Sequence, residues 1–305
     1  MTSATVPRRP GGLMRTLDRS GWPAAFPFLA VALFGFTVFQ LIPIIRGFYY
    51  SVTDWNLLQD PTFVGLKNFQ DIIDDKVFWN ALIVTTEYVL INIGLQTVLA
   101  IGIALLMDRL TRSTILRSLI LLPWLISNVV VAMTFLWILD FNLGIVNKLI
   151  TSLGLGGVSF FGEQALVMPT IAVINVWRHM GYTALLIFGG LQLIPKDMYE
   201  AGGLDGASEW QMFRKITLPL LRPVLALVLT ITIIGSFQIF DTVAVATQGG
   251  PVNASRVINY YIFDQAFGRF HFGYAAAMAV VLFAILAAIS FIQLRLSRAG
   301  TSDLA

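Results

Sequence analysis

Residues 200–219 read EAGGLDGASEWQMFRKITLP and form the longest polar interruption in the second half of a very apolar chain. Pro195 suits the start of a helix just before this stretch, because its missing N–H costs nothing at the first helical position. Gly202, Gly203 and Gly206 disfavour a long helix, since glycine loses more backbone freedom on folding than any other residue. The pattern predicts a short helix followed by a turn.

A second short helix is predicted after the turn. Ser208 followed by Gln211 fits a capping box, in which each residue satisfies a backbone N–H of the other. Pro219 is expected to end this helix, because proline has no N–H to donate. Taken alone, such a helix-turn-helix is also typical of a solvated connection between two membrane spans.

The composition predicts an all-α integral membrane protein. The chain has 305 residues, of which 57% are hydrophobic and only 12% are charged, and its mean hydropathy is +0.78. Soluble globular proteins average about 25% charged residues, so most of this surface cannot face water. Helices are the economical way to satisfy the backbone within a bilayer.

The residue types argue against several kinds of site. Cysteine is absent, and two histidines, His179 and His271, are too few for a His-rich metal site. The net charge of +3 gives no indication of nucleic-acid binding. The sequence contains no phosphate-binding loop of the Gly-x4-Gly-Lys-Ser/Thr kind and no catalytic triad. We therefore predict no catalytic or metal-binding residues, no bound cofactor and no ATP hydrolysis by this chain alone.

Six apolar stretches are long enough to cross a bilayer, which takes about 20 residues in a helix. The arginines before the first stretch raise the alternative of a cleaved signal peptide. That run is longer than a signal core of about 7–15 residues, and no small-x-small cleavage site ends it, so we expect it to be retained. The six predicted spans are residues 26–45, 81–107, 119–139, 167–193, 223–240 and 274–294. The predicted organisation is a tail (1–22), a transmembrane domain (23–298) and a second tail (299–305).

Basic residues collect on one side of the predicted spans, and the positive-inside rule makes that side cytoplasmic. Both termini and the segments 108–118 and 195–222 are therefore predicted inside the cell. The basic residues of the predicted inner side are Arg8, Arg9, Arg15, Arg19, Arg109, Arg112, Arg117, Lys196, Arg214, Lys215, Arg222, Arg295 and Arg298. Those of the outer side are Arg46, Lys67, Lys76, Lys148, Arg256 and Arg269.

Two predicted outer segments leave alternatives open. Residues 47–80 are acidic and include an amphipathic stretch near 68–73, which suits either a solvated loop or a docking surface for an external partner. Residues 242–272 contain the aromatic run 260–263, which suits either an interfacial helix at the headgroups or an aromatic belt.

Polar side chains inside the spans are the next signal, since they are costly in a bilayer and usually face a bundle interior or a cavity. Singly, each is equally consistent with hydrogen bonding between helices. Together they predict a polar path, and amides beside aromatic rings suit a sugar. Arg178 and His179 could instead mark an outer interface if the fourth span started after them. The predicted path residues are Glu87, Asn128, Asn175, Trp177, Arg178, Tyr182, Ser236, Gln238 and Asp241.

The order Glu-Ala-Gly, Asp-Gly-Ala, Phe and Ile-x-Leu-Pro within residues 200–219 resembles the cytoplasmic "EAA" loop of permease subunits of ATP-binding-cassette (ABC) importers. Further motifs are similar to maltose-type sugar permeases, of the subunit kind that carries the longer first outer loop. The resemblance runs from about residue 24 to 298. The further motifs are Thr53-Asp-Trp, Phe63-Val-Gly-Leu-x-Asn68, Leu122-Pro123, Phe237-Gln-x-Phe-Asp241 and Gly249-Gly-Pro251.

The resemblance implies a type I importer fold with six transmembrane helices and a cytoplasmic helix-turn-helix coupling loop at 195–222. It also implies a plasma-membrane complex with a second homologous permease, two copies of an ABC ATPase subunit that bind ATP and Mg, an extracytoplasmic solute-binding protein and membrane lipids, but no nucleic acid. The implied ATPase-coupling residues are Glu200, Ala201, Asp205, Gly206, Ala207, Met212, Phe213, Ile216, Leu218 and Pro219.

The residue types suit that role. Gly206 permits a turn that a side chain would obstruct, and Met212, Phe213 and Ile216 offer an apolar face for a groove. Gly202 departs from the alanine usual in the family, so the first helix is expected to be shorter or more mobile.

Other functions are weighed against a sugar importer. A glycerol-phosphate cargo would favour several cationic side chains in the path, and Arg178 is the one cation predicted within a span. Permeases for amino acids or metals usually have a shorter first outer loop than residues 47–80. An ion-coupled carrier would predict internal repeats and broken half-helices, which the sequence does not suggest.

Overall fold

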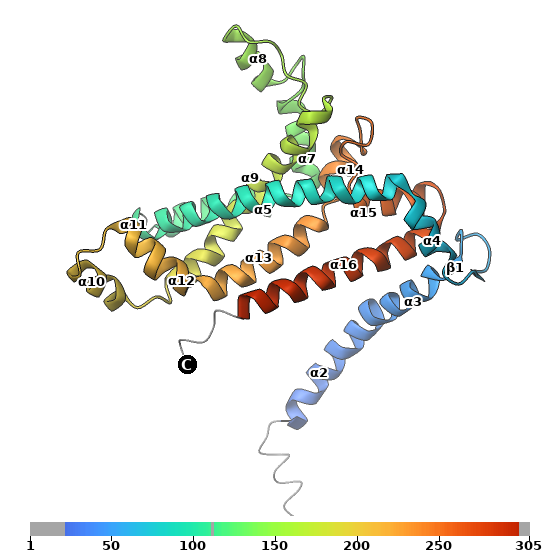
Figure 1. Cartoon of the computed structure of the whole chain (residues 1–305), viewed down its shortest axis with the longest axis horizontal. Coiled ribbons are helices and arrows are strands. Elements are labelled where there is room, and N and C mark those ends of the chain that lie inside the picture. The colour runs from blue at the N-terminus through green and yellow to red at the C-terminus, as the bar shows by residue number, and fades with distance from the viewer. Residues whose placement is uncertain (1–21, 111–112, 299–305) are drawn as a thin grey trace, which may run out of the picture.

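A computed structural model describes residues 22–110 and 113–298, and it is almost entirely helical. Helices α5 (Lys76–Leu110), α9 (Gln164–Leu191), α13 (Arg222–Phe237) and α16 (Phe272–Arg298) form the body of the molecule (Figure 1). Within the part of the chain that the structure describes, five helical runs are long and apolar enough to cross a membrane: Phe26–Ser51, Lys76–Arg109, Gln164–Leu191, Arg222–Ala246 and Phe272–Gln293.

The predicted third span is broken, which the sequence did not predict. Helices α6 (Thr114–Leu125) and α7 (Asn128–Ile138) meet at an angle of 88°, and the pair counts as a sixth span if it crosses as one unit. Arg178 of α9 stabilises the break, because its guanidinium donates to the carbonyls of Trp124 (3.1 Å) and Ile126 (2.9 Å). A break in a helix is tolerated at membrane depth where the freed backbone groups find such partners.

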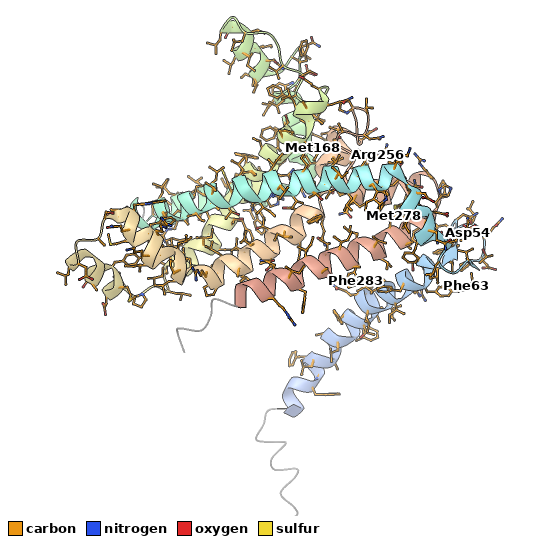
Figure 2. The ribbon with its side chains drawn as sticks, in the orientation of Figure 1. Asp54, Phe63, Met168, Arg256, Met278 and Phe283 are labelled. Atoms are coloured by element: carbon orange, nitrogen blue, oxygen red, sulfur yellow. The ribbon has the colours of Figure 1, made fainter. Side chains whose placement is uncertain are left out.

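The first span packs on its own chain at one end. Helix α2 (Trp22–Phe36), the π-helical turn η1 (Thr37–Leu41) and α3 (Ile42–Ser51) follow one another. Phe48 of α3 lies edge-to-face against Phe283 of α16, with ring centroids 6.1 Å apart, and Figure 2 shows Phe283 on the side of α16 that faces α3. Towards its N-terminal end, α2 runs away from the body (Figure 1).

The core has two clusters of buried apolar side chains. One includes Phe78, Met168 and Met278, of which both methionines are labelled in Figure 2, and the other includes Met107 and Ile187. Because α5, α9 and α13 contribute to both clusters, these three helices form the centre of the fold.

One end of the body, here called the hairpin end, is closed by short elements. These are the antiparallel pair β1 (Thr53–Asp54) and β2 (Thr62–Phe63), then α4 (Lys67–Asp74), α15 (Ile258–Phe263) and the π-helical turn η3 (Asp264–Gly268). A Cβ on Gly273 would lie 2.0 Å from the carbonyl oxygen of Thr53, so the start of α16 can approach β1 only because residue 273 is glycine.

Two predictions for this end have different outcomes. The amphipathic helix near residues 68–73 is confirmed, since α4 buries Asn68 and Ile72 and exposes Ile73. The aromatic run 260–263 lies in helix α15, which buries Tyr261 in the core and exposes Phe263, so an interfacial helix and an aromatic belt both stay open for it.

At the opposite end, here called the loop end, the 195–222 segment forms the predicted helix-turn-helix. Helix α10 (Lys196–Leu204) is followed by a turn in which Gly206 has φ +73°. Helix α11 (Glu209–Met212) starts with the predicted capping box: Ser208 N–H donates to Gln211 Oε1 (2.8 Å) and Gln211 N–H donates to Ser208 Oγ (3.4 Å).

The prediction that Pro219 ends the second helix is wrong. The chain continues from α11 through the π-helical turn η2 (Phe213–Thr217) and α12 (Leu218–Leu220) towards α13. In the π-turn, Leu218 N–H bonds to the carbonyl of Phe213, five residues earlier. This wider turn changes the hydrogen-bond register before Pro219, so the proline is accommodated.

The remaining elements lie beside the body. Helix α8 (Ile145–Ser152) lies between α7 and α9 in the chain and projects from the body together with α7 (Figure 1). Helix α14 (Asp241–Ala246) follows α13 after a short break. Residues 1–21 of the predicted tail 1–22, the predicted tail 299–305, and Arg112 lie outside the described residues, whereas Trp22 begins α2.

Candidate functional site

A cavity of about 260 Å³ lies among α5, α6, α7, α9, α13 and α14. Small-molecule sites typically have volumes of about 300–1,000 Å³, so this cavity is small for a complete site. Its wall combines amides, hydroxyls and aromatic rings with a carboxylate. The polar and aromatic members are Tyr88, Asn92, Gln96, Trp124, Asn128, Asn175, His179, Tyr182, Thr183, Thr232, Ser236, Gln238, Phe240, Asp241 and Thr242.

Two amides of α5 form a network in one part of the wall. Asn92 Nδ2 donates to Gln96 Oε1 (3.1 Å) and to Ser236 Oγ of α13 (2.9 Å). Gln96 Nε2 donates to Thr183 Oγ1 of α9 (2.7 Å). Asn92 is 4% exposed, yet its Oδ1 accepts no hydrogen bond from any described residue. The network therefore leaves a buried acceptor without a donor from the described chain, on a residue that lines the cavity, which is unfavourable.

A second buried acceptor without a donor in the described chain lies where α7 meets α14. Asn128, the first residue of α7, donates from Nδ2 to Asp241 Oδ2 (2.8 Å). Its own Oδ1 is buried and receives no hydrogen bond from the described part of the chain. The break in the third span therefore brings an amide oxygen and a carboxylate together at the cavity.

A flat aromatic pair completes this wall. The rings of Trp124 and Tyr182 are stacked, with centroids 4.7 Å apart and planes 9° apart. The side chain of Arg178 holds the backbone at the break next to Trp124, and its Nη1 lies 2.8 Å from His179 Nε2. His179 Nδ1 donates to the carbonyl of Asn175 (2.9 Å), so its ring is fixed on both sides.

The structure brings six of the nine predicted path residues together in this wall: Asn128, Asn175, Tyr182, Ser236, Gln238 and Asp241. The other three are not part of it. Glu87 is exposed on α5, Trp177 packs edge-on against Phe135, and Arg178 holds the break. Because α9 begins at Gln164, Arg178 and His179 lie well inside the fourth span and do not precede it.

The predicted path includes Glu87 from the second span and omits Asn92 and Gln96 of the same span, which line the cavity. The helical period would have distinguished them, because Tyr88, Asn92 and Gln96 are spaced four residues apart and share one face. Glu87 precedes Tyr88 by one position and therefore points about a quarter-turn away.

The predicted coupling residues of the 195–222 loop fall into two sets. Glu200, Ala201, Asp205 and Gly206 are exposed, whereas the others are half-buried. No residue of α10 is buried. This helix is held against η2 by a hydrogen bond between the Tyr199 and Thr217 hydroxyls (2.9 Å) and by close packing of Gly202. The half-buried set is Ala207, Met212, Phe213, Ile216, Leu218 and Pro219.

Two large apolar side chains at the loop end are exposed. Leu204 is 90% exposed and Trp210 is 68% exposed, and both belong to the helix-turn-helix. Exposed apolar groups of this size beside acidic Glu200 and Asp205 are typical of a surface that another protein covers.

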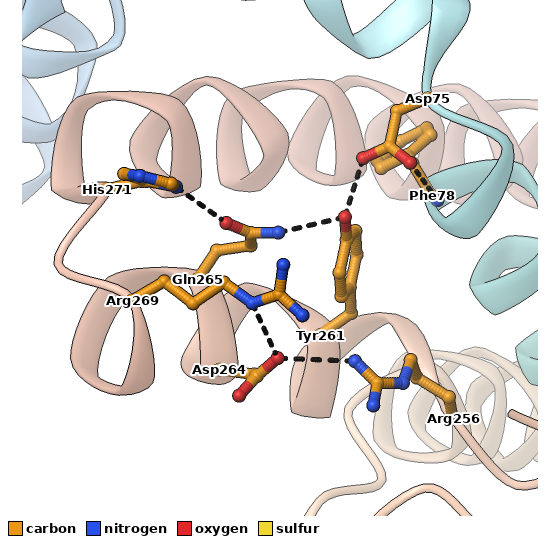
Figure 3. A network of polar contacts seen from close by, with 8 residues as sticks. All are labelled: Asp75, Phe78, Arg256, Tyr261, Asp264, Gln265, Arg269 and His271. Carbon is orange, nitrogen blue, oxygen red and sulfur yellow. Dashed lines mark hydrogen bonds and ion pairs between the residues drawn. The ribbon is translucent and has the colours of Figure 1, made fainter.

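The hairpin end holds a polar network centred on Asp75 (Figure 3). Oδ1 of Asp75 caps α5 by accepting from the N–H groups of Val77 (2.8 Å) and Phe78 (3.1 Å). Its Oδ2 accepts from the hydroxyls of Tyr261 (2.6 Å) and Tyr274 (2.7 Å). One carboxylate therefore joins the start of α5 to α15 and α16.

The network extends along η3. Gln265 Nε2 donates to the Tyr261 hydroxyl (2.9 Å), and Gln265 Oε1 lies 3.0 Å from His271 Nδ1. Asp264 pairs with Arg256 (3.2 Å) and with Arg269 (3.4 Å) (Figure 3). Each of these side chains has at least one polar partner, which is typical of a structural network.

Two pKa values follow from these contacts. Burial would raise the pKa of Asp75, but the hydrogen bonds from Tyr261, Tyr274, Phe78 and Val77 together hold it below its ordinary value. Burial, and donation of its hydroxyl proton to Asp75, raise the pKa of Tyr261 to about 12. Both groups keep the protonation states that the network needs at neutral pH.

A bundle of membrane-spanning helices with a polar cavity at its centre and a two-helix loop at one end is the architecture of a transport subunit. The chain belongs to the family of binding-protein-dependent transport system inner membrane components, whose model matches residues 96–300. The resemblance inferred from the loop motif and the all-α membrane fold are thereby confirmed.

Known proteins that are similar to this chain support the same family assignment. The chain is 30% identical over 280 residues to the trehalose/maltose transport system permease protein MalF of Thermococcus litoralis, which covers 91% of this chain and 93% of that protein. It is 33% identical over 276 residues to the probable starch degradation products transport system permease protein AmyD of Thermoanaerobacterium thermosulfurigenes, covering 89% and 92% of the two chains.

A solved structure shows the same fold. A chain of a bacterial alginate ABC transporter, in complex with an alginate pentasaccharide-bound periplasmic protein, superposes with a TM-score of 0.82 at 22% identity, covering 95% of this chain and 98% of that one. The fold is therefore that of a type I ABC importer permease.

Proposed function

We propose that this chain is the permease subunit of an ATP-driven importer and forms, with a second homologous permease, the membrane pathway for a sugar or oligosaccharide. An extracytoplasmic binding protein delivers the cargo, and two ABC ATPase subunits, which bind ATP and Mg, contact the 195–222 loop. The loop end is cytoplasmic in this proposal, because Arg109, Arg117, Lys196, Arg214 and other basic residues collect there.

The cavity supports a sugar as cargo. The observation that carries this proposal is the pair of buried amide oxygens, on Asn92 and Asn128, that accept no hydrogen bond from described residues. Sugar hydroxyls are donors that would satisfy both oxygens once the two side chains turn towards the cavity. The stacked rings of Trp124 and Tyr182 provide a flat apolar surface for the face of a pyranose.

The same wall disfavours an anionic cargo such as glycerol-phosphate. Asp241 contributes a carboxylate to the cavity, whereas the guanidinium of Arg178 is already bonded to backbone carbonyls at the break. A phosphate would therefore meet a negative charge and no free cation among the described residues of this wall. The small volume of the cavity fits a site that a second permease completes.

The test is uptake by the intact complex, purified through a tag on this chain and reconstituted into vesicles. Radiolabelled sugars are supplied with the binding protein outside, and ATP is enclosed on the side of the loop end. We expect ATP-dependent uptake of at least one sugar. We expect Asn92→Leu to lower that uptake about tenfold, as for loss of a buried hydrogen bond to the cargo.

Thr86→Val is the matched control, since Thr86 lies on the exposed face of α5 and its hydroxyl bonds to its own helix. It should leave uptake unchanged. Uptake that continues without ATP would contradict the importer, and equal uptake by Asn92→Leu and wild type would contradict the assignment of the cavity.

A further inference from the structure

The last turn of α5 contacts the chain on both sides of α10. Arg109 forms an ion pair with Glu209, the first residue of α11. The preceding residue, Asp108, accepts from Gln192 Nε2 (2.7 Å) just after the end of α9. The segment from Gln192 to Glu209, which includes α10, is therefore attached at both ends to two adjacent residues of one helix.

We propose that this double contact anchors the 195–222 loop to α5, and that Arg109 is a positioning residue through which movement of the loop reaches the cavity. The proposal rests on the proposed function, because it assumes that a motor protein moves the loop. It adds a specific route, from Glu209 through Arg109 along α5 to Asn92 and Gln96.

Helix α5 is suited to carry such a movement. It is continuous over its 35 residues and contains no proline. Arg109 lies 13 positions after Gln96, which corresponds to about 20 Å along a helix axis. A displacement of the last turn along that axis therefore moves the cavity amides by a similar amount, because a helix resists compression.

The packing of α5 on α9 keeps the route rigid. Ala100 and Ala104 of α5 are fully buried in the same core cluster as Ala184 and Ile187 of α9. Small residues let two helices approach closely, which limits sliding of one against the other. The cavity residues of both helices, such as Gln96 and Thr183, therefore move as one unit.

The anchor contributes little to folding stability. The side chains of Arg109 and Glu209 are 55% and 69% exposed, and exposed ion pairs are weak because water and salt screen them. Breaking the pair should leave the protein folded and inserted. Its effect should appear in the amount of cargo imported per ATP hydrolysed, which a merely structural contact would not alter.

The experiment is a charge swap in the reconstituted complex. We expect Arg109→Glu and Glu209→Arg each to lower import per ATP about tenfold, a typical size for coupling between two sites. The double variant with both changes restores the pair with reversed charges and should return to within about twofold of wild type. Arg295→Glu is the matched control, since it makes the same charge change at an exposed residue of α16 outside the loop.

The outcomes separate the anchor from the proposed function. If wild-type complex imports no cargo with ATP, the proposed function fails. If wild type imports normally and the single variants do too, or if the double variant is as defective as the single ones, the anchor is wrong. Equal amounts of each variant in the membrane confirm that folding is unaffected.

A cross-link provides an independent measurement. The chain has no cysteine, so a variant with both Arg109→Cys and Glu209→Cys contains two thiols, one at each position of the ion pair. Before joining, this variant lacks the ion pair and should import poorly, and a bifunctional maleimide that joins the two thiols should restore import per ATP, because an anchor stays closed throughout the cycle. Import per ATP that stays low or falls further on joining would show that a closed contact does not support transport and would overturn the anchor.

Discussion

The two ends of the molecule are held together in different ways. At the hairpin end, buried polar side chains join segments far apart in the chain: Tyr261 and Gln265 are each 4% exposed, and Asp75 bonds to Tyr274 across 199 positions. At the loop end, α10 has no buried residue, and Leu204 is 90% exposed.

The difference indicates which end can move. A buried polar network is stable only when all of its members are paired, so it favours a single arrangement. A segment with few buried contacts changes position at low cost, and its exposed apolar groups are satisfied when another protein covers them. We infer that the hairpin end is a rigid frame, whereas the loop end is completed by its partner.

The largest expected effect comes from the turn of the loop. Gly206 has φ +73°, a conformation that costs other residues about 1 kcal/mol or more. We expect Gly206→Asp to leave the protein inserted but to uncouple import from ATP hydrolysis, because the two helices lose their relative orientation. Both rates are measured in reconstituted vesicles.

Gly203→Asp is the control for that experiment. Gly203 lies in α10 with ordinary helical geometry, and a Cβ there meets no atom within 4 Å. The Gly203→Asp variant adds the same negative charge as Gly206→Asp, three residues away, without backbone strain. Normal import by Gly206→Asp would contradict the role of the turn.

The second-largest expected effect tests whether the hairpin end is a rigid frame. Asp75→Ala removes the cap of α5 and leaves the hydroxyls of Tyr261 and Tyr274 without their acceptor. We expect a loss of about 2–4 kcal/mol in the free energy of unfolding, the sum of a lost cap and lost hydrogen bonds to a charged group. Thermal unfolding in detergent would show it, with exposed Asp74→Ala as the control that should unfold like wild type.

The pKa of Asp75 also predicts how the stability of the protein falls at acid pH. The folded-state pKa of Asp75 lies below its ordinary value of 3.8, so its stabilising contribution is complete above that value. It is lost as the pH falls through the lower, folded-state pKa, because protonation weakens the hydrogen bonds that the carboxylate accepts. The stability of Asp75→Asn should therefore fall less steeply than that of wild type below about pH 4. Parallel curves would contradict this assignment.

The sequence predicted features that depend on neighbouring residues. The spans follow from runs of apolar residues, and the capping box of Ser208 and Gln211 spans four positions. The turn at Gly206 likewise follows from one residue type. Six of the nine predicted path residues line one cavity, because a polar group in a span usually faces a bundle interior.

Features that depend on distant residues were not predicted. The break in the third span needs Arg178, which lies more than 50 positions after Trp124 and supplies the missing donors. The core position of Tyr261 depends on Asp75, 186 positions earlier. Passage of the helix through Pro219 depends on a π-turn, which has no clear pattern in a single sequence.

The smallest expected effect concerns Gly202, where the family usually has alanine. A Cβ there would lie 3.1 Å from Ile216 Cδ1 and 3.6 Å from Met212 Cγ, so glycine lets α10 pack closely on η2. Gly202→Ala gains about 1 kcal/mol in helix propensity but must displace the flexible end of Ile216. We expect the gain in helix propensity and the cost of displacing Ile216 nearly to cancel, because exposed α10 can shift slightly at low cost. Import per ATP should therefore stay within about twofold of wild type. Gly202→Ala with Ile216→Val removes the colliding methyl group and should then be more stable than wild type. A loss of import in Gly202→Ala that Ile216→Val restores would instead show that the loop end is held as tightly as the hairpin end.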